Sequence, residues 1–130
     1  MITKTTELFV TAQNSTGLLS KILQTCKDAG MNIFGVSAFN VESTAYVRIL
    51  GDNAQRAAES SQLTNIATSV EVINALVAPA NDSAQLHTYA ENLGDEGVDF
   101  TWAYTTHYNN QPSFVFSTKN NDVAASVINA

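Results

Sequence analysis

The strongest constraint on the fold of this 130-residue chain is an internal repeat. A shift of 67 residues places FVTAQNSTGLLSKILQTCKDAGMNIFG over LVAPANDSAQLHTYAENLGDEGVDFTW without a gap, and Gly30 falls on Gly97. With one residue added near the HYNNQP segment, the shift becomes 68 and AYVRILGDNAQRAA lies over SFVFSTKNNDVAAS. Self-similarity of this kind indicates two copies of one supersecondary unit. We therefore expect one domain over residues 1–70 and a second over residues 71–130.

The first copy shows the order strand, helix, strand, strand, helix, strand. An apolar run at residues 8–10 predicts the first strand, and MNIFGVSAF and TAYVRIL predict two strands joined by the polar turn NVES. A helix is predicted before Gly30, because apolar residues recur on one helix face: Leu18, Leu19, Ile22, Leu23 and Cys26. A second helix is expected from GDNAQRAAES, capped by Asp52 or Asn53, followed by a strand over residues 66–70.

The second copy repeats this order but stops early. VDFTWAY alternates, with Val98, Phe100, Trp102 and Tyr104 on one face, which predicts a strand. SFVFST supplies its hairpin partner and NNDVAASVINA a closing helix. The last strand is therefore missing, or it is supplied by the other lobe or another chain, because an open sheet edge invites pairing. Each copy predicts an α+β ferredoxin-like βαββαβ sandwich, so the chain forms two tandem repeats of antiparallel sheets with helices on one face.

Composition excludes several classes of protein. No apolar run approaches the roughly 18 residues of a membrane span, and the N-terminus lacks the apolar region of a signal peptide, so we expect a cytoplasmic protein without a membrane partner. Cys26 is the only cysteine, which excludes an internal disulfide framework and a cysteine zinc site. The net charge of -6 argues against a nucleic-acid partner.

Charge is distributed unevenly between the two copies. Residues 1–70 hold five acidic and five basic side chains, whereas residues 71–130 hold seven acidic side chains and one basic side chain, Lys119. We therefore expect an anionic ligand group to bind against the first copy rather than the second.

A family resemblance follows from these residues. AQNSTGLLSKILQTCKDAGMNIFGVSAF resembles the first half of an ACT domain, a small-molecule regulatory module with a polar residue, a Pro-Gly pair, a leucine-rich helix and then Gly-(Ile/Val)-Asn-Ile. The second copy resembles the pattern more weakly, so the chain looks like a stand-alone tandem ACT protein. Three residues depart from the pattern: Thr16 replaces the proline, Ala84 replaces the loop glycine, and Asp99 replaces the second-strand asparagine.

The resemblance implies an amino-acid site between two modules. The ligand would lie against the loop before the first helix and beside the start of the second strand of a neighbouring module. By position, the implied first-copy residues are Asn14, Ser15, Thr16, Gly17, Leu18, Asn32 and Ile33. The implied second-copy residues are Asn81, Asp82, Ser83, Ala84, Gln85, Asp99 and Phe100.

The chemistry of these residues suits an amino acid, although a simpler interpretation is also open. Amide groups at a helix start favour a carboxylate, Gly17 lets the main chain approach closely, and the Asn32 amide offers both donors and an acceptor. The NSTG segment is equally typical of an ordinary helix cap, and Asn32 after Gly30 is also typical of a turn.

No catalytic constellation is found. His87 and His107 stand in unrelated contexts without a third ligand at metal spacing, so no metal site and no cofactor are predicted. Cys26 on the apolar helix face indicates packing rather than redox chemistry, and Trp102 and Tyr104 indicate core or inter-lobe packing rather than a stacking platform.

Three functions remain from the sequence. The favoured one is a non-enzymatic sensor in which an amino acid bridges ACT interfaces and shifts an equilibrium read by a partner enzyme or regulator. The alternatives are a structural interaction module with a decayed pocket, and a small ferredoxin-like enzyme. We also expect at least a homodimer, because both faces of NIFGVSAF are apolar, with Ile33 and Phe39 on one and Phe34 and Val36 on the other.

Overall fold

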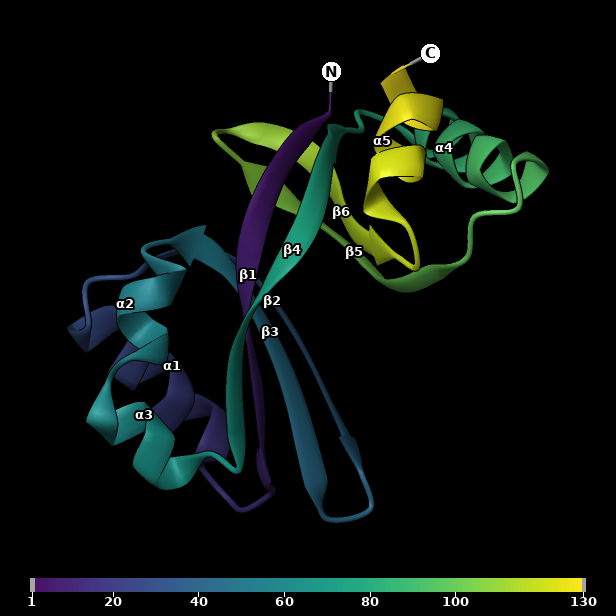
Figure 1. Ribbon diagram of the computed structural model, residues 1–130. Coiled ribbons are helices and arrows are strands. Elements are labelled where there is room, and N and C mark those ends of the chain that lie inside the picture. The colour runs from purple at the N-terminus through teal and green to yellow at the C-terminus, as the bar shows by residue number, and fades with distance from the viewer. Residues whose placement is uncertain (1, 130) are drawn as a thin grey trace. The chain divides into compact units, whose positions relative to one another are not determined.

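The computed structural model describes residues 2–129, which divide into two compact units (Figure 1). The first unit comprises Thr6–Ile73, and the second unit combines the residues up to Thr5 with those from Asn74 onward. Two strands, β1 (Thr3–Gln13) and β4 (Ser69–Pro79), cross these boundaries, so each contributes one part to each unit.

The first unit is a four-stranded sheet with helices on one face (Figure 1). Its strands follow the order β2-β3-β1-β4, and β3 pairs antiparallel with both β1 and β2. Between β1 and β4, the elements are α1 (Leu18–Asp28), β2 (Asn32–Val41), β3 (Thr44–Asp52), α2 (Ala54–Ala58) and α3 (Ser61–Ile66). This order confirms the predicted ferredoxin-like βαββαβ fold.

The second unit repeats that fold with a strand borrowed from the start of the chain. Its elements are the second part of β4, α4 (Ser83–Asp95), β5 (Phe100–Tyr108), β6 (Gln111–Thr118) and α5 (Asn121–Asn129). The strand order is β1-β4-β6-β5, so the start of β1 takes the position of the last strand. The Ile2 amide donates to Asn129 Oδ1 at 3.1 Å, and Lys4 pairs with Asp122 at 3.0 Å, which joins this segment to α5.

Each unit has its own apolar core between sheet and helices. In the first unit, Leu8 and Val10 of β1 pack with Ile22 of α1 and Ile49 of β3, all fully buried. In the second unit, Leu76 and Phe116 pack with Leu93 of α4 and with alanines of α5. The alternation along each strand thus buries one sheet face under the helices.

The repeat holds at 67 residues over the whole chain, so the predicted change to 68 is wrong. Both hairpin turns, at residues 42–43 and 109–110, keep the shift of 67, as do the starts of α2 and α5. Ile49 and Phe116 are equivalent core positions at that spacing. Apolar letters alone allowed the extra residue because both β3 and β6 are apolar at consecutive positions.

A β-bulge at the same place in both copies corrects the predicted strand faces. The register shifts between Ile33 and Gly35 in β2 and between Phe100 and Trp102 in β5, leaving one extra residue in each strand. An extra residue reverses the side-chain alternation that follows it. The two strands therefore share an irregularity that their alternation could not reveal.

In β2, Ile33 and Val36 consequently share the helix-facing side, whereas Phe39 pairs with Tyr46 on the opposite side. In β5, Phe100 lies on the face opposite to Trp102 and Tyr104. The predicted pairings of Ile33 with Phe39 and of Phe100 with Trp102 are therefore wrong.

Three further boundaries differ from expectation. Residues 66–70 are not a separate strand, because Ile66 ends α3, and β4 is one continuous strand of 11 residues. Helix α3 was not expected. Asn53 does stand at the N-cap of α2, but its side chain donates to the Gly30 carbonyl at 3.1 Å and does not cap the helix. Tertiary bonding thus overrode a local preference.

Candidate ligand-binding grooves

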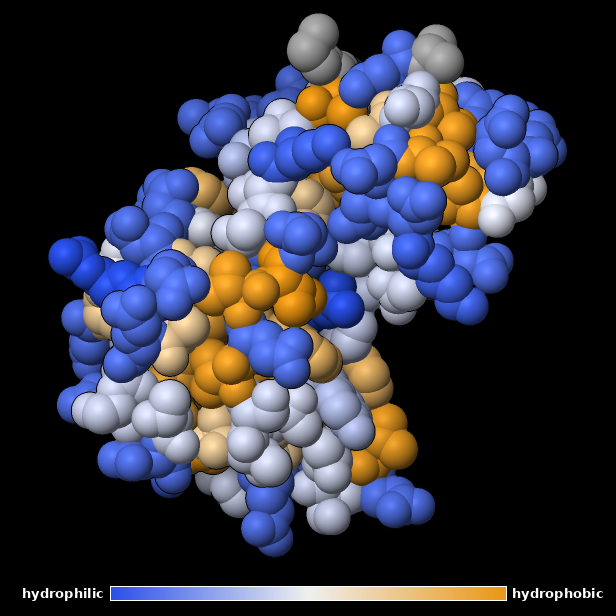
Figure 2. Space-filling model, in the orientation of Figure 1, coloured by the Kyte–Doolittle hydropathy of each residue, from blue (hydrophilic) through white to orange (hydrophobic). Residues whose placement is uncertain are grey.

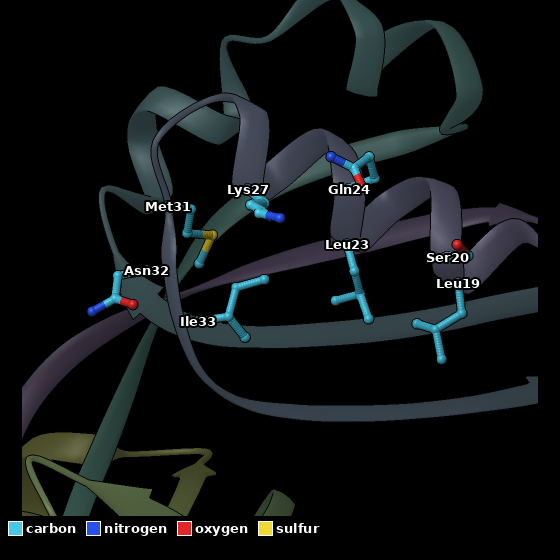
Figure 3. A pocket seen from close by; sticks show the side chains of 8 residues that line it. All are labelled: Leu19, Ser20, Leu23, Gln24, Lys27, Met31, Asn32 and Ile33. Carbon is cyan, nitrogen blue, oxygen red and sulfur yellow. The ribbon is translucent and has the colours of Figure 1, made fainter.

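A groove of about 720 Å³ runs between α1 and β2 in the first unit (Figure 3). Strand β2 stands at the end of the strand order, so the groove opens along a sheet edge. The groove is lined by Leu19, Ser20, Leu23, Gln24, Lys27, Met31, Asn32 and Ile33. We call it the first-unit groove.

The floor of the first-unit groove is apolar and its rim is polar. Leu19 and Leu23 project from α1 toward β2, and Ile33 lies between Leu23 and Met31 (Figure 3). Leu19 is 42% exposed although it belongs to the predicted apolar helix face, because it lines the groove instead of the core. Lys27, in the last turn of α1, and the exposed Asn32 place a cation and an amide at the same end of the groove. Such a combination suits a small polar ligand with an apolar part.

The NSTG loop before α1 is held by its main chain. The Asn14 amide donates to the Ser43 carbonyl at 2.7 Å, and the Leu18 amide donates to the Ser15 carbonyl at 3.1 Å. Gly17 is the N-cap residue with φ of 82°, and no side chain of the described residues caps α1. The loop therefore does not follow the ordinary side-chain capping pattern.

This loop and Asn32 lie at opposite ends of the first unit. Gln13, the residue before the loop, pairs with Thr44, whereas Asn32 pairs with Asp52 at the other end of β3. Helix α1 has 11 residues between them, a rise of ~16 Å. Within the unit, Asn32 and Ile33 come together with α1, whereas Asn14, Ser15, Thr16 and Gly17 lie outside the groove, and Leu18 is buried in the core.

The corresponding loop of the second unit is closed by its own hydrogen bonds. Asp82 caps α4 by accepting from the Gln85 amide at 2.9 Å, and Gln85 Oε1 accepts from the Asn81 amide at 2.8 Å. Gln111 donates to Asn81 Oδ1 at 2.7 Å. Ser83 is the first residue of α4. These contacts match a helix cap, with reciprocal use of Asp82 and Gln85.

A second pocket, of about 370 Å³, lies between α4 and β5 and contains Asp99 and Phe100. Its other lining residues come from the helix, the loop after it and the sheet: Ala90, Leu93, Gly94, Val98, Ala103, Phe114 and Phe116. We call it the second-unit pocket. Sequence reasoning identified Asp99 and Phe100 but missed the helix residues, which read only as small or polar positions of α4.

The remaining reactive side chains do not assemble into a site. Burial raises the pKa of the Cys26 thiol to about 11, and His87 and His107 are exposed. Among residues 2–129, no three His, Cys, Asp or Glu side chains are grouped so that they hold a metal ion. No helix in this range is long and apolar enough to cross a membrane.

Comparison with solved structures supports the tandem architecture. A Bacteroides thetaiotaomicron protein superposes with a TM-score of 0.81 at 17% identity, covering 98% of this chain and 88% of that one. The regulatory subunit of aspartate kinase from Thermus flavus gives a TM-score of 0.67 at 10% identity, with 98% and 92% covered. Its ligand-free Thermus thermophilus counterpart gives 0.66 at 10% identity, with 98% and 94% covered. At these identities the likeness concerns the fold.

Sequence comparison identifies the family. No curated protein matches the chain. The family described as the ACT domain pair matches residues 1–130, in agreement with the two ferredoxin-like units and their shift of 67 residues. The chain is therefore a member of the ACT domain pair family.

Proposed function

We propose that this protein is a non-enzymatic regulatory module that binds an amino acid in the first-unit groove. The observation that carries the proposal is the position of Asn32 and Lys27 at one end of an open, apolar-floored groove on a sheet edge. The Asn32 amide can accept from an ammonium and donate to a carboxylate, and Lys27 adds charge for the carboxylate. The family match supports a ligand-binding role for this edge.

The proposal includes a second copy of the chain. Asn14, Ser15, Thr16 and Gly17 lie at the end of the first unit remote from Asn32, so they can reach a ligand in the groove only from a neighbouring copy. Two copies that align β2 edges in opposite directions would bring each loop to the other's groove. Binding would then favour the paired state, and a partner enzyme or regulator in the cytoplasm would respond to it.

A structural role is favoured only for the loop of the second unit. Asn81 and Asp82 already accept or donate bonds within that loop, so an incoming carboxylate would have to displace them. In the first unit no described side chain occupies the equivalent position at the start of α1. We therefore place the anionic end of a ligand in the first unit rather than at the cap of α4.

A thermal-shift screen against the twenty common amino acids at millimolar concentration tests this function. A ligand at a hundredfold its dissociation constant stabilises the folded state by about 2.7 kcal/mol, which raises the melting temperature by a few degrees. We expect a dose-dependent shift that Asn32→Ala removes. Asn65→Ala, an exposed position on α3 outside the groove, is the matched control and should retain the shift.

The proposal is wrong if no amino acid changes the melting temperature. It is also wrong for this groove if a genuine shift persists unchanged in Asn32→Ala.

A further inference from the structure

The second-unit pocket differs from the first-unit groove in how deeply it reaches. The two occupy equivalent places, because Leu23, Met31 and Ile33 correspond to Ala90, Val98 and Phe100 at the repeat of 67. In the second unit, however, the pocket also reaches Leu93, Phe114 and Phe116, of which Leu93 and Phe116 are core residues.

Three substitutions between the copies account for this depth. Where the first unit has Leu23, Lys27 and Val36, the second has Ala90, Gly94 and Ala103. Each exchange removes a side chain from the space between helix and edge strand. The result is a pocket of about 370 Å³, within the range of small-molecule sites.

Gly94 has no evident structural requirement in α4. A methyl group added at this position would meet nothing within 4 Å, and its φ is not in the left-handed region. Glycine nevertheless weakens a helix relative to alanine. The absence of a side chain at Gly94 is therefore better explained by the open pocket beside it than by packing or backbone geometry.

The walls of the pocket are apolar and one charged pair stands at its rim. Phe114 stacks on Phe116 with ring centroids 4.9 Å apart, which gives a flat aromatic wall. Asp99 lines the pocket, and its Oδ2 lies 3.6 Å from Lys119 Nζ. Both charged side chains are largely exposed, so they can turn from each other to the two charges of a zwitterion without being dehydrated.

We propose that the second-unit pocket binds an amino acid with an apolar side chain, such as leucine or phenylalanine. The side chain enters between α4 and β5 against Phe114 and Phe116, the ammonium faces Asp99, and the carboxylate faces Lys119. The proposal rests on the proposed function in that it assumes an amino-acid ligand, and it adds a second site and a ligand class.

Isothermal titration calorimetry of the full chain with leucine, phenylalanine, threonine and lysine tests the proposal. We expect heat of binding with the two apolar amino acids. Ala90→Leu restores the side chain that fills the first-unit groove and should weaken their affinity at least tenfold. Thr88→Leu places the same side chain on an exposed position of α4 outside the pocket and should leave the affinity unchanged.

A second variant keeps the test independent of folding. Asp99→Asn preserves the shape of the pocket but removes the charge that faces the ammonium, so it should weaken the same two ligands. Thermal melting of each variant without ligand verifies that it is folded.

The outcomes separate this proposal from the proposed function. If only threonine or lysine binds, or if apolar amino acids bind equally to wild type, Ala90→Leu and Asp99→Asn but lose affinity in Asn32→Ala, the second-unit pocket is not the site and the proposed function stands. If none of the four amino acids nor any of the other sixteen binds, both are wrong.

Discussion

Cys26 illustrates how burial alone sets the chemistry of a residue. Its side chain is fully buried against the sheet, and the pKa of the thiol rises from 9.0 to about 11 because burial disfavours the thiolate. A pKa raised in the folded state stabilises the fold fully below pH 9 and loses that contribution as pH rises toward 11. We expect Cys26→Ala to be less stable than wild type at pH 8, with a gap that narrows by pH 10.5.

Urea unfolding of both proteins at the two pH values measures this gap. A constant difference would contradict the buried-thiol account. The same burial predicts that iodoacetamide at pH 8 modifies Cys26 only after urea unfolds the protein.

Arg48 and Glu7 form a buried ion pair on adjacent strands. Arg48 Nη1 lies 3.4 Å from Glu7 Oε1, with 9% and 1% of the residues exposed, and the guanidinium lies 5.2 Å from the centre of the Phe9 ring. Removing one partner leaves a buried charge, so Arg48→Met should destabilise the fold by about 3–5 kcal/mol.

The double variant Arg48→Met with Glu7→Leu should recover much of that loss, because the uncompensated carboxylate is gone. Chemical denaturation of the two variants and wild type gives both differences. Equal stability of the single and double variants would show that the pair is not coupled.

At the level of the helices, two glycines of the second unit make opposite predictions. Neither Gly94 nor Gly97 has any atom within 4 Å of an added methyl group, but Gly97 has φ of 68°. Gly94→Ala should therefore stabilise the fold by about 0.5–1 kcal/mol, whereas Gly97→Ala should destabilise it by roughly 1 kcal/mol. Urea denaturation distinguishes them, and the same sign for both would contradict the backbone assignment.

Secondary structure and its order could be predicted because apolar spacing dictates both. The helix at Leu18 and the paired strands β5 and β6 follow directly from such patterns. The bulges at Phe34 and Thr101 could not be predicted, because an extra residue in one strand is fixed by its partner's register. The strand faces and the later repeat spacing therefore went wrong.

The candidate sites were predictable only on their strand side. Asn32 and Asp99 could be identified from the family pattern, and both line an opening in the structure. Leu19 and Ala90 could not, because their role depends on the distance between a helix and an edge strand rather than on sequence neighbours. The cap at Asp82 follows a local pattern, but the side chain of Asn53 turned to a carbonyl distant in sequence.

For the whole molecule, the sheet edges predict association. Strands β2 and β5 end the strand order, and Val36, Phe39 and Val41 of β2 are 37%, 47% and 52% exposed. An apolar edge favours pairing with another copy, and a lysine there opposes it. We expect a homodimer at micromolar concentration by light scattering, weakened by Val36→Lys.

Val123→Lys, at an exposed position of α5 that is 42% exposed, is the matched control and should remain dimeric. A protein that is monomeric at micromolar concentration and above would contradict the assembly.

The most direct test of ligand binding is hydrogen–deuterium exchange of the full chain with and without a mixture of the twenty L-amino acids. A bound amino acid restrains the elements that contact it and slows their exchange. We expect slower exchange in residues 19–33 and 90–103, and no change with the corresponding D-amino acids. Identical exchange throughout the chain in all three conditions would contradict the account of this ACT domain pair as an amino-acid-binding module.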